Sequence, residues 1–140
     1  MTHAIAGVLP VVHMPYTESG AIDLATMGKQ IDYLFEVGAD GFCLALVSDL
    51  FRLSEQERMA LPAQLCSFAQ QRGPVVINVA AESTQQAQLY ARAAEDGGAA
   101  ALMAIPPISR ALGEDELRAY FTSILNEVDI PVFVQDASSY

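Results

Sequence analysis

Apolar runs alternate with segments of helical periodicity along almost the whole of this 140-residue chain. The apolar runs predict five strands, and the amphipathic segments between them predict four helices. The strands are expected at residues 5–12, 41–47, 75–79, 99–105 and 131–135. These runs are continuous rather than alternating, which is typical of strands buried on both faces of a parallel sheet. The pattern therefore predicts a series of strand–helix units.

Capping and turn residues delimit the predicted helices. Asp23 can cap the first helix, and Gly38 can end it. Ser54 and Glu57 have the spacing of a capping box at the start of the second helix. Pro62 lies inside that second helix and removes a backbone donor, so we expect a kink or an early break there.

Two architectures are built from such units, a closed (β/α)₈ barrel and a doubly wound sheet. The segment 36–40, at the end of one predicted helix, resembles the segment 95–99 at the end of another. A closed barrel needs ~250 residues. We therefore expect residues 1–140 to form one domain, the first five strands and four helices of a (β/α)₈ TIM barrel, incomplete at the C-terminus. The alternative is a self-contained, flavodoxin-like sheet with helices on both faces.

Composition and charge narrow the range of functions. The net charge of −10 argues against binding to nucleic acid or to an anionic membrane surface, because both need basic patches. No segment approaches the ~18 apolar residues of a membrane helix, and the N-terminus lacks the basic start of a signal peptide. Cys43 and Cys66 are interpreted as small apolar residues in a reducing compartment, with a disulfide or metal pair as the lesser alternative. We expect a cytoplasmic protein.

Polar residues follow several predicted strands, at the end of the sheet where ligands bind in both architectures. His13 follows the first strand and is either a general base or a hydrogen-bonded strand-end residue. Ser48 and Asp49 end the second strand and either bind a substrate carboxylate or hydroxyl or form a turn. Gln135 and Asp136 end the fifth strand and either bind a substrate hydroxyl or lie at a solvated chain end.

Two further polar residues have alternative interpretations. Asn78 either bridges layers of a barrel core or faces a ligand, and Arg110 either clamps a carboxylate or lies in a solvated loop. His13 and the carboxylates lack the close spacing of metal ligands, and the chain has no phosphate-binding glycine motif. We therefore expect neither a metal nor a cofactor.

Eight short motifs occur in an order that resembles the dihydrodipicolinate synthase / N-acetylneuraminate lyase family. They are Gly7–Pro10, Met14–Tyr16, Gly20–Asp23, Gly38–Gly41, Leu53–Arg58, Ala81–Thr84, Ile105–Pro107 and Ile130–Val132. The resemblance implies class I aldolases and dehydratases on a (β/α)₈ barrel, usually tetrameric. Such enzymes form a Schiff base between a lysine on the sixth strand and pyruvate or another 2-keto acid.

The sequence departs from the family pattern at its functional positions. The segment Leu46–Asp49 stands where the family has Thr-Thr-Gly-Glu, and Ile108 and Ser109 stand where it has two tyrosines. Gln135 replaces the tyrosine that acts as general acid and base, and an amide cannot donate and recover a proton as a phenol does. Lys29 is the only lysine, and its helical phase points away from the apolar stripe.

These departures favour a diverged relative, a sugar-acid dehydratase or a 2-keto acid aldolase, over dihydrodipicolinate synthase itself. The chain is expected to be the N-terminal portion of such a lyase and to be inactive alone, because it lacks the Schiff-base lysine. Its expected partners are a small 2-keto acid in the full-length context, and further copies of itself or a missing C-terminal half. A non-catalytic interaction domain, or a remnant without function, remains the alternative, so enzymatic activity stays open.

Overall fold

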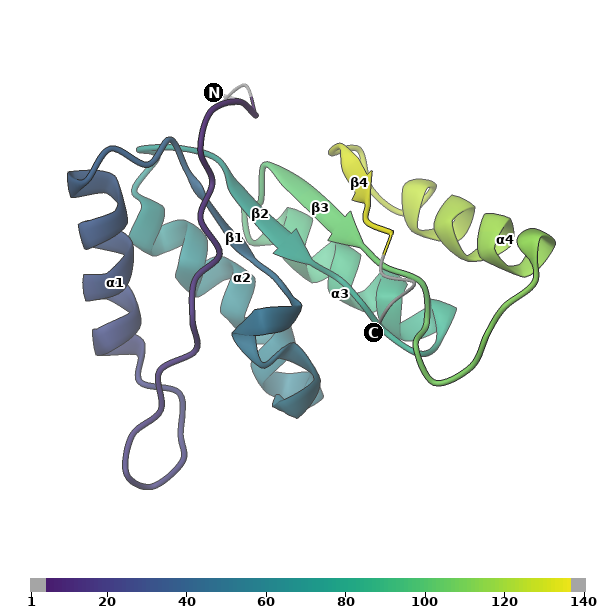
Figure 1. The fold of residues 1–140 in the computed structure, drawn as a ribbon, viewed down its shortest axis with the longest axis horizontal. Coiled ribbons are helices and arrows are strands. Elements are labelled where there is room, and N and C mark those ends of the chain that lie inside the picture. Colours follow the sequence, from purple (N-terminus) through teal and green to yellow (C-terminus); the bar gives the residue numbers. More distant parts are fainter. Residues whose placement is uncertain (1–4, 137–140) are drawn as a thin grey trace.

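The computed structural model describes residues 5–136, which form a parallel sheet with helices between its strands (Figure 1). The strands are hydrogen-bonded in the order β1-β2-β3-β4, all parallel. Two short 3₁₀ turns, η1 and η2, follow the first strand. The elements, in chain order, are α1 (Leu24–Glu36), β1 (Phe42–Leu44), η1 (Leu46–Ser48), η2 (Leu50–Arg52), α2 (Glu55–Ala69), β2 (Val75–Asn78), α3 (Thr84–Asp96), β3 (Ala101–Ala104), α4 (Glu114–Leu125) and β4 (Val132–Val134).

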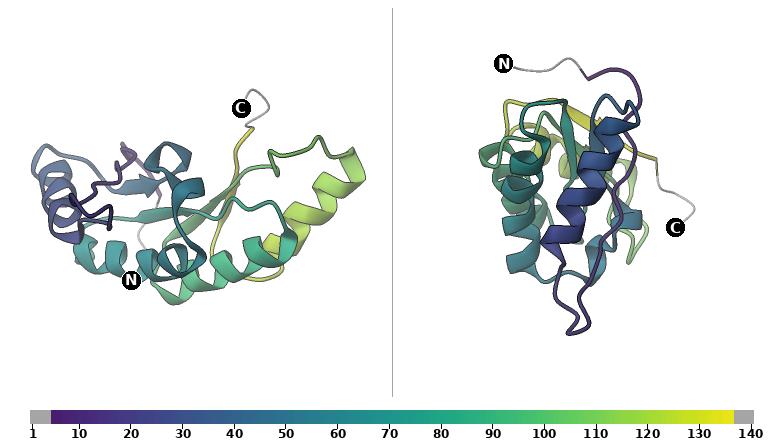
Figure 2. Two further views of the ribbon diagram at one scale, coloured as in Figure 1. Left: turned by 90° about the horizontal axis from the view of Figure 1, so that it is seen from below. Right: turned by 90° about the vertical axis from the view of Figure 1, so that its left-hand side faces the viewer.

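All four helices lie on one face of a curved sheet (Figure 2). On β2, Val75 and Ile77 belong to the main core with the helices, whereas Val76 belongs to a separate cluster on the other face. This alternation is the one that a strand imposes on successive side chains. The predicted fold class, parallel strand–helix units of the barrel type, is confirmed, and the flavodoxin-like alternative, with helices on both faces, is wrong.

The first predicted strand, residues 5–12, is an extended segment that lies beside β1 (Figure 1). It makes a single parallel bridge, between Val11 and Cys43. The Cys43 N–H donates to the Pro10 carbonyl at 2.8 Å, and the Val12 N–H donates to the Cys43 carbonyl at 2.9 Å. Pro10 itself has no N–H to donate, which limits the ladder on this side. The segment therefore occupies the place of a strand without forming a regular one.

Two equivalent turns confirm the internal repeat. Gly38 and Gly98 have φ of +93° and +94°, a left-handed conformation that favours glycine. After each glycine, an alanine N–H (Ala39 and Ala99) donates to the carbonyl five residues earlier, at 2.9 and 3.0 Å. The two turns make Gly38 equivalent to Gly98. The sequence segments 36–40 and 95–99 instead align Gly38 with Gly97, one position earlier.

α2 begins at the predicted capping box and runs through its proline. The Glu57 N–H donates to the Ser54 hydroxyl at 3.2 Å, and the Ser54 N–H donates to the Glu57 carboxylate at 2.8 Å. The expected break at Pro62 does not occur, because α2 continues to Ala69. Pro62 is buried under α3, where the backbone of Gly97 approaches closely, so helix packing offsets the lost hydrogen bond.

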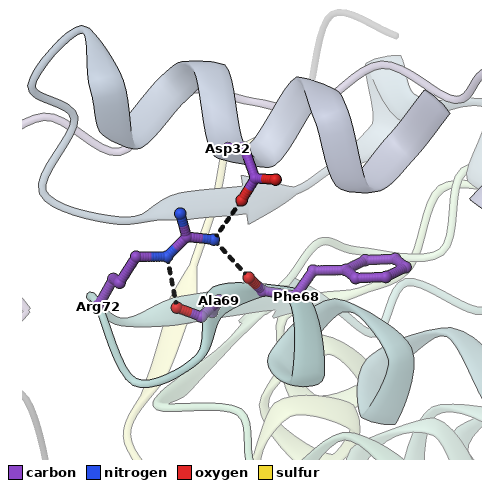
Figure 3. A network of polar contacts seen from close by, with 4 residues as sticks. All are labelled: Asp32, Phe68, Ala69 and Arg72. Atoms are coloured by element: carbon purple, nitrogen blue, oxygen red, sulfur yellow. Dashed lines mark hydrogen bonds and ion pairs between the residues drawn. The ribbon is translucent and has the colours of Figure 1, made fainter. Parts of the chain in front are cut away.

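An arginine joins the first two helices (Figure 3). The guanidinium of Arg72 donates to the Asp32 carboxylate at 2.7 Å and to the carbonyls of Phe68 and Ala69 at 2.6 and 3.0 Å. It also lies 4.5 Å from the centre of the Phe35 ring. Arg72 therefore satisfies two carbonyls at the end of α2, where a cation is favoured, and fixes that end against α1.

The face of the sheet away from the helices, called the inner face below, is apolar and partly open. Its cluster consists of Cys43, Val76 and Ala101, with Ile5, Leu9 and Met103 packed against it. Toward β4, Phe133, which is in register with Met103, is 44% exposed. Within residues 5–136 no strand pairs with the outer edge of β4. The open edge that a half-barrel implies is therefore present.

Candidate functional site

Ser48 connects the end of the N-terminal segment to the turn after β1. Its side chain is fully buried, and its hydroxyl donates to the Val12 carbonyl. The same oxygen accepts a hydrogen bond from the Ala45 N–H at 3.3 Å. The predicted strand 41–47 is too long, because β1 ends at Leu44 and Ser48 belongs to η1. Both of its hydrogen bonds position backbone at the carboxyl end of β1.

Asp49 is half-buried and has a left-handed backbone between η1 and η2, with φ of +59°. Such a conformation is uncommon outside glycine and clusters at functional sites. Tyr16 lies close enough to respond to this carboxylate. Burial first, and then the charge of Asp49, raise the pKa of Tyr16 above its ordinary value, while Arg52 opposes them.

His13 is exposed, and α1 holds its backbone. The His13 N–H donates to the Gln30 side-chain oxygen at 2.8 Å, and the Gln30 amide donates to the His13 carbonyl at 3.2 Å. This paired contact fixes the chain directly after the N-terminal segment. The His13 ring therefore projects from an anchored position near the same end of the sheet as Ser48.

Asn78 is the last residue of β2 and is buried on the inner face. Its side-chain oxygen accepts a hydrogen bond from the Ala80 N–H at 2.8 Å, which fixes the orientation of the amide. Its Nδ2 is buried and makes no hydrogen bond within the described part of the chain. A buried donor without a partner costs about 1–3 kcal/mol, so this nitrogen needs an explanation.

Sequence reasoning missed Arg58, which supports this strand end from the helix side. Its guanidinium donates to the carbonyls of Ala80 and Asn78 at 2.6 and 3.4 Å and lies 3.9 Å from the centre of the Tyr90 ring. Burial lowers the pKa of Arg58, and Tyr90 partly opposes that shift. A signal was present, because Arg58 precedes Leu61 by three positions on the apolar face of its helix.

The loop after β2 holds the loop after β3. The Tyr120 hydroxyl donates to the Ala81 carbonyl at 3.1 Å. The Glu82 carboxylate accepts hydrogen bonds from the N–H groups of Ile108 and Ser109 at 2.9 and 3.0 Å. Partial burial raises the pKa of Glu82, but these hydrogen bonds outweigh it, and the net pKa lies below its ordinary value. The two loops are thus one connected unit.

The structure places the other predicted binding residues after β4 and in the loop after β3. Gln135 follows β4, and its N–H donates to the Ala104 carbonyl at 2.9 Å, while its side-chain oxygen is buried without a partner within residues 5–136. Asp136 follows it and is exposed. Arg110 is paired with Glu116 at 3.0 Å in an exposed loop rather than directed toward the sheet.

The predicted binding residues that follow the strands lie at the carboxyl end of the sheet, but they do not meet in a single cluster. Ser48 and Asp49 follow β1, whereas Gln135 and Asp136 follow β4, three strands away. Neighbouring strands are ~4.8 Å apart, so the two pairs lie roughly 14 Å from each other along the sheet. Asn78 lies between them on β2. Among the described residues, no group of three histidine, cysteine or acidic side chains is placed to hold a metal ion.

The two cysteines lie away from this edge. Both are free thiols, Cys43 buried and Cys66 partly buried. Burial raises the pKa of Cys43 and raises that of Cys66 to about 11. Cys66 lines a hollow of about 480 Å³ at the opposite end of the strands, with Gly73 and Gly98. In the part of the chain that the structure describes, no helix is long and apolar enough to cross a membrane.

Proteins of known name are similar to this chain in sequence. The chain is 31% identical over 135 residues to L-2-keto-3-deoxyarabonate dehydratase of Azospirillum brasilense, covering 94% of this chain and 44% of that protein. It is 29% identical over 130 residues to the Escherichia coli K12 protein named "Probable 2-dehydro-3-deoxy-D-pentonate aldolase YjhH", covering 92% of this chain and 43% of that protein.

Solved structures show the same fold. YagE from Escherichia coli K12, solved in complex with pyruvate, superposes with a TM-score of 0.90 at 24% identity, over 93% of this chain and 44% of that one. CdNal from Clostridium difficile, solved with mannosamine, gives 0.91 at 18% identity, over 96% and 47%. The chain spans less than half the length of these relatives. The family model of the dihydrodipicolinate synthetase family matches residues 4–139, and the chain belongs to that family.

Proposed function

We propose that this chain is the N-terminal portion of a Schiff-base lyase, an aldolase or dehydratase that acts on a pyruvate-like 2-keto acid or a sugar acid. The observation that carries the proposal is the match of residues 4–139 to the family, combined with polar residues at the carboxyl edge of the sheet. Ser48, Asp49, Gln135, Asp136 and His13 are the substrate-binding candidates. The named activity of the Azospirillum brasilense relative favours a hydroxylated acid.

The chain by itself is proposed to lack this activity. A Schiff base needs a lysine in a desolvated pocket. Lys29, the only lysine, is exposed on α1, and α1 lies on the face of the sheet opposite the inner face. The nucleophile would come from the part of the relatives that this chain does not span.

The open inner face and the outer edge of β4, which pairs with no strand within residues 5–136, support a second part of the proposal. An exposed strand edge with apolar neighbours pairs readily with another chain. Phe133 and Val134 are exposed at that edge, and Val8, within the N-terminal segment, is 67% exposed. The remaining strands of the barrel, or further copies of the chain, would cover these surfaces. The free thiols of Cys43 and Cys66 fit a cytoplasmic setting.

Reduction with borohydride in the presence of pyruvate tests the proposal. The isolated chain should gain no adduct on Lys29, whereas the complete gene product should gain one, located by peptide mapping to a lysine outside residues 1–140. Lys29→Arg is the matched control and should leave trapping in the complete product unchanged. An adduct on Lys29 would overturn the assignment of the nucleophile. Failure of trapping in the complete product would favour the non-catalytic interaction domain.

A further inference from the structure

Within residues 5–136, the two buried side-chain atoms without a hydrogen-bond partner are Asn78 Nδ2 and Gln135 Oε1. One is a donor and the other an acceptor. More than nine-tenths of buried polar groups in folded proteins are paired, so two such atoms in one region are unusual. Their position and chemistry therefore bear on what the site binds.

Both atoms belong to residues on the inner face at the carboxyl edge. Asn78 shares its face with Val76, two positions earlier, which belongs to the inner cluster. Gln135 lies on the face opposite Val132, which packs against the helix-side core. β3 is the strand between them, with Met103 in register with Asn78 and with Phe133. Two strand spacings and two residues along the strand separate their backbones by roughly 12 Å, and both side chains rise from the same face of the sheet.

A hydrogen bond fixes the orientation of the Asn78 side-chain amide. Its oxygen faces the Ala80 N–H, so the nitrogen must lie on the other side. Arg58 holds the carbonyls of Asn78 and Ala80 from behind the strand. The donor is thus preorganised, and a rotation that would pair it elsewhere would break an existing hydrogen bond.

We infer that Asn78 and Gln135 bind one hydroxyl group of the substrate, which makes that substrate a hydroxylated 2-keto acid. A hydroxyl accepts a hydrogen bond and donates one, so it satisfies both atoms. The oxygens of pyruvate only accept, so pyruvate cannot satisfy Gln135 Oε1. The inference rests on the proposed function and adds Asn78 to its binding residues. Met103 is in register with Asn78 on β3 and shares its face of the sheet, so its flexible side chain would neighbour the bound ligand.

Binding measurements on the complete gene product test this assignment. The probes are L-2-keto-3-deoxyarabonate, which carries hydroxyls, and pyruvate, which carries none. Asn78→Asp keeps the acceptor for Ala80 and removes the donor, and Gln135→Met keeps the length and removes the acceptor. Each should weaken binding of the hydroxylated acid at least tenfold and change binding of pyruvate less than twofold. Asn126→Asp, the same substitution at the exposed end of α4, is the matched control and should change neither.

The double variant makes the test sharper. If both residues contact the same hydroxyl, Asn78→Asp combined with Gln135→Met loses less affinity than the product of the two single losses. Equal weakening for both acids, or no weakening for either, would overturn the inference. Additive losses would also overturn it, because they would place the residues on separate groups.

A measurement on the unmodified protein covers the case in which a variant fails to fold. The side-chain amide signals of Asn78 and Gln135, observed by nuclear magnetic resonance, should shift when L-2-keto-3-deoxyarabonate is added and remain unchanged with pyruvate. Unchanged signals at saturation would indicate a buried water or another protein group as the partner and would overturn the inference. Borohydride trapping that succeeds alongside this failure would leave the proposed function intact, whereas failure of both would reject both.

Discussion

The guanidinium of Arg58 lies 3.9 Å from the centre of the Tyr90 ring, with α2 and α3 thereby joined behind the end of β2. The same group donates to two carbonyls of the strand end, at Asn78 and Ala80. Within residues 5–136 no carboxylate pairs with this buried guanidinium, which is tolerated because carbonyls and an aromatic face surround it. Contacts from α2 and α3 thus help to position the end of β2, where Asn78 lies on the inner face.

Replacement of Arg58 should destabilise the fold. Arg58→Met leaves two buried carbonyls without donors, which should lower the free energy of unfolding by about 2–4 kcal/mol. Arg58→Lys keeps the charge but not the planar fork, so its loss should be smaller, about 1–3 kcal/mol. Urea unfolding measures both. Arg118→Lys, in an exposed pair with Glu114, is the control and should change stability little. Similar losses at positions 58 and 118 would contradict this role.

A side chain at Gly73 should be poorly tolerated. A Cβ placed there would lie 1.9 Å from the Asp40 carbonyl oxygen, between the segments that lead into β1 and β2. Gly73→Ala should therefore cost about 1–3 kcal/mol of stability, because the two backbones must separate. Gly113→Ala is the matched control, since its nearest contact would be 3.8 Å away. Equal melting temperatures for the two variants would exclude the close approach.

The pKa of Glu82 predicts a dependence of stability on pH. Because its pKa is lower in the folded protein than its ordinary value of 4.5, Glu82 adds stability above that value, and the contribution is lost as the pH falls through the folded pKa. Glu82→Gln removes this contribution to stability. Melting temperatures between pH 3 and 7 should fall less steeply in the variant on the acidic side of about 4.5. Parallel profiles for the variant and the parent would contradict the assignment.

Cys66 should react slowly with alkylating agents despite its partial exposure. Its pKa of about 11, against an ordinary value of 9.0, reduces the thiolate at pH 8 by about 100-fold, and the thiolate is the reactive form. Mass spectrometry of a time course with iodoacetamide measures the rate, with the denatured chain as the control. Native and denatured rates within a few-fold of each other would show that burial does not suppress the thiolate.

Local pattern was sufficient for the order of the strands and helices and for the start of α2. The periodicity predicted α1–α4, and capping chemistry located the start of α2 at Ser54, because these signals depend on residues a few positions apart. The strands were predicted too long. β1 stops at Leu44, because an apolar run reports burial, whereas a strand also needs a paired neighbour. Pro62 was judged by local chemistry alone, and its packing under α3 is a tertiary effect.

The sequence by itself determined the repeated strand–helix units, the polar residues at the strand ends and the absence of any lysine except Lys29. Only the tertiary structure decided that all helices lie on one face, because single apolar stripes suit one-sided and two-sided coverage equally. It also decided which polar atoms are satisfied. The Ser48 hydroxyl has its partners, whereas Asn78 Nδ2 has none within residues 5–136, a distinction that depends on groups distant in the chain, such as Val12.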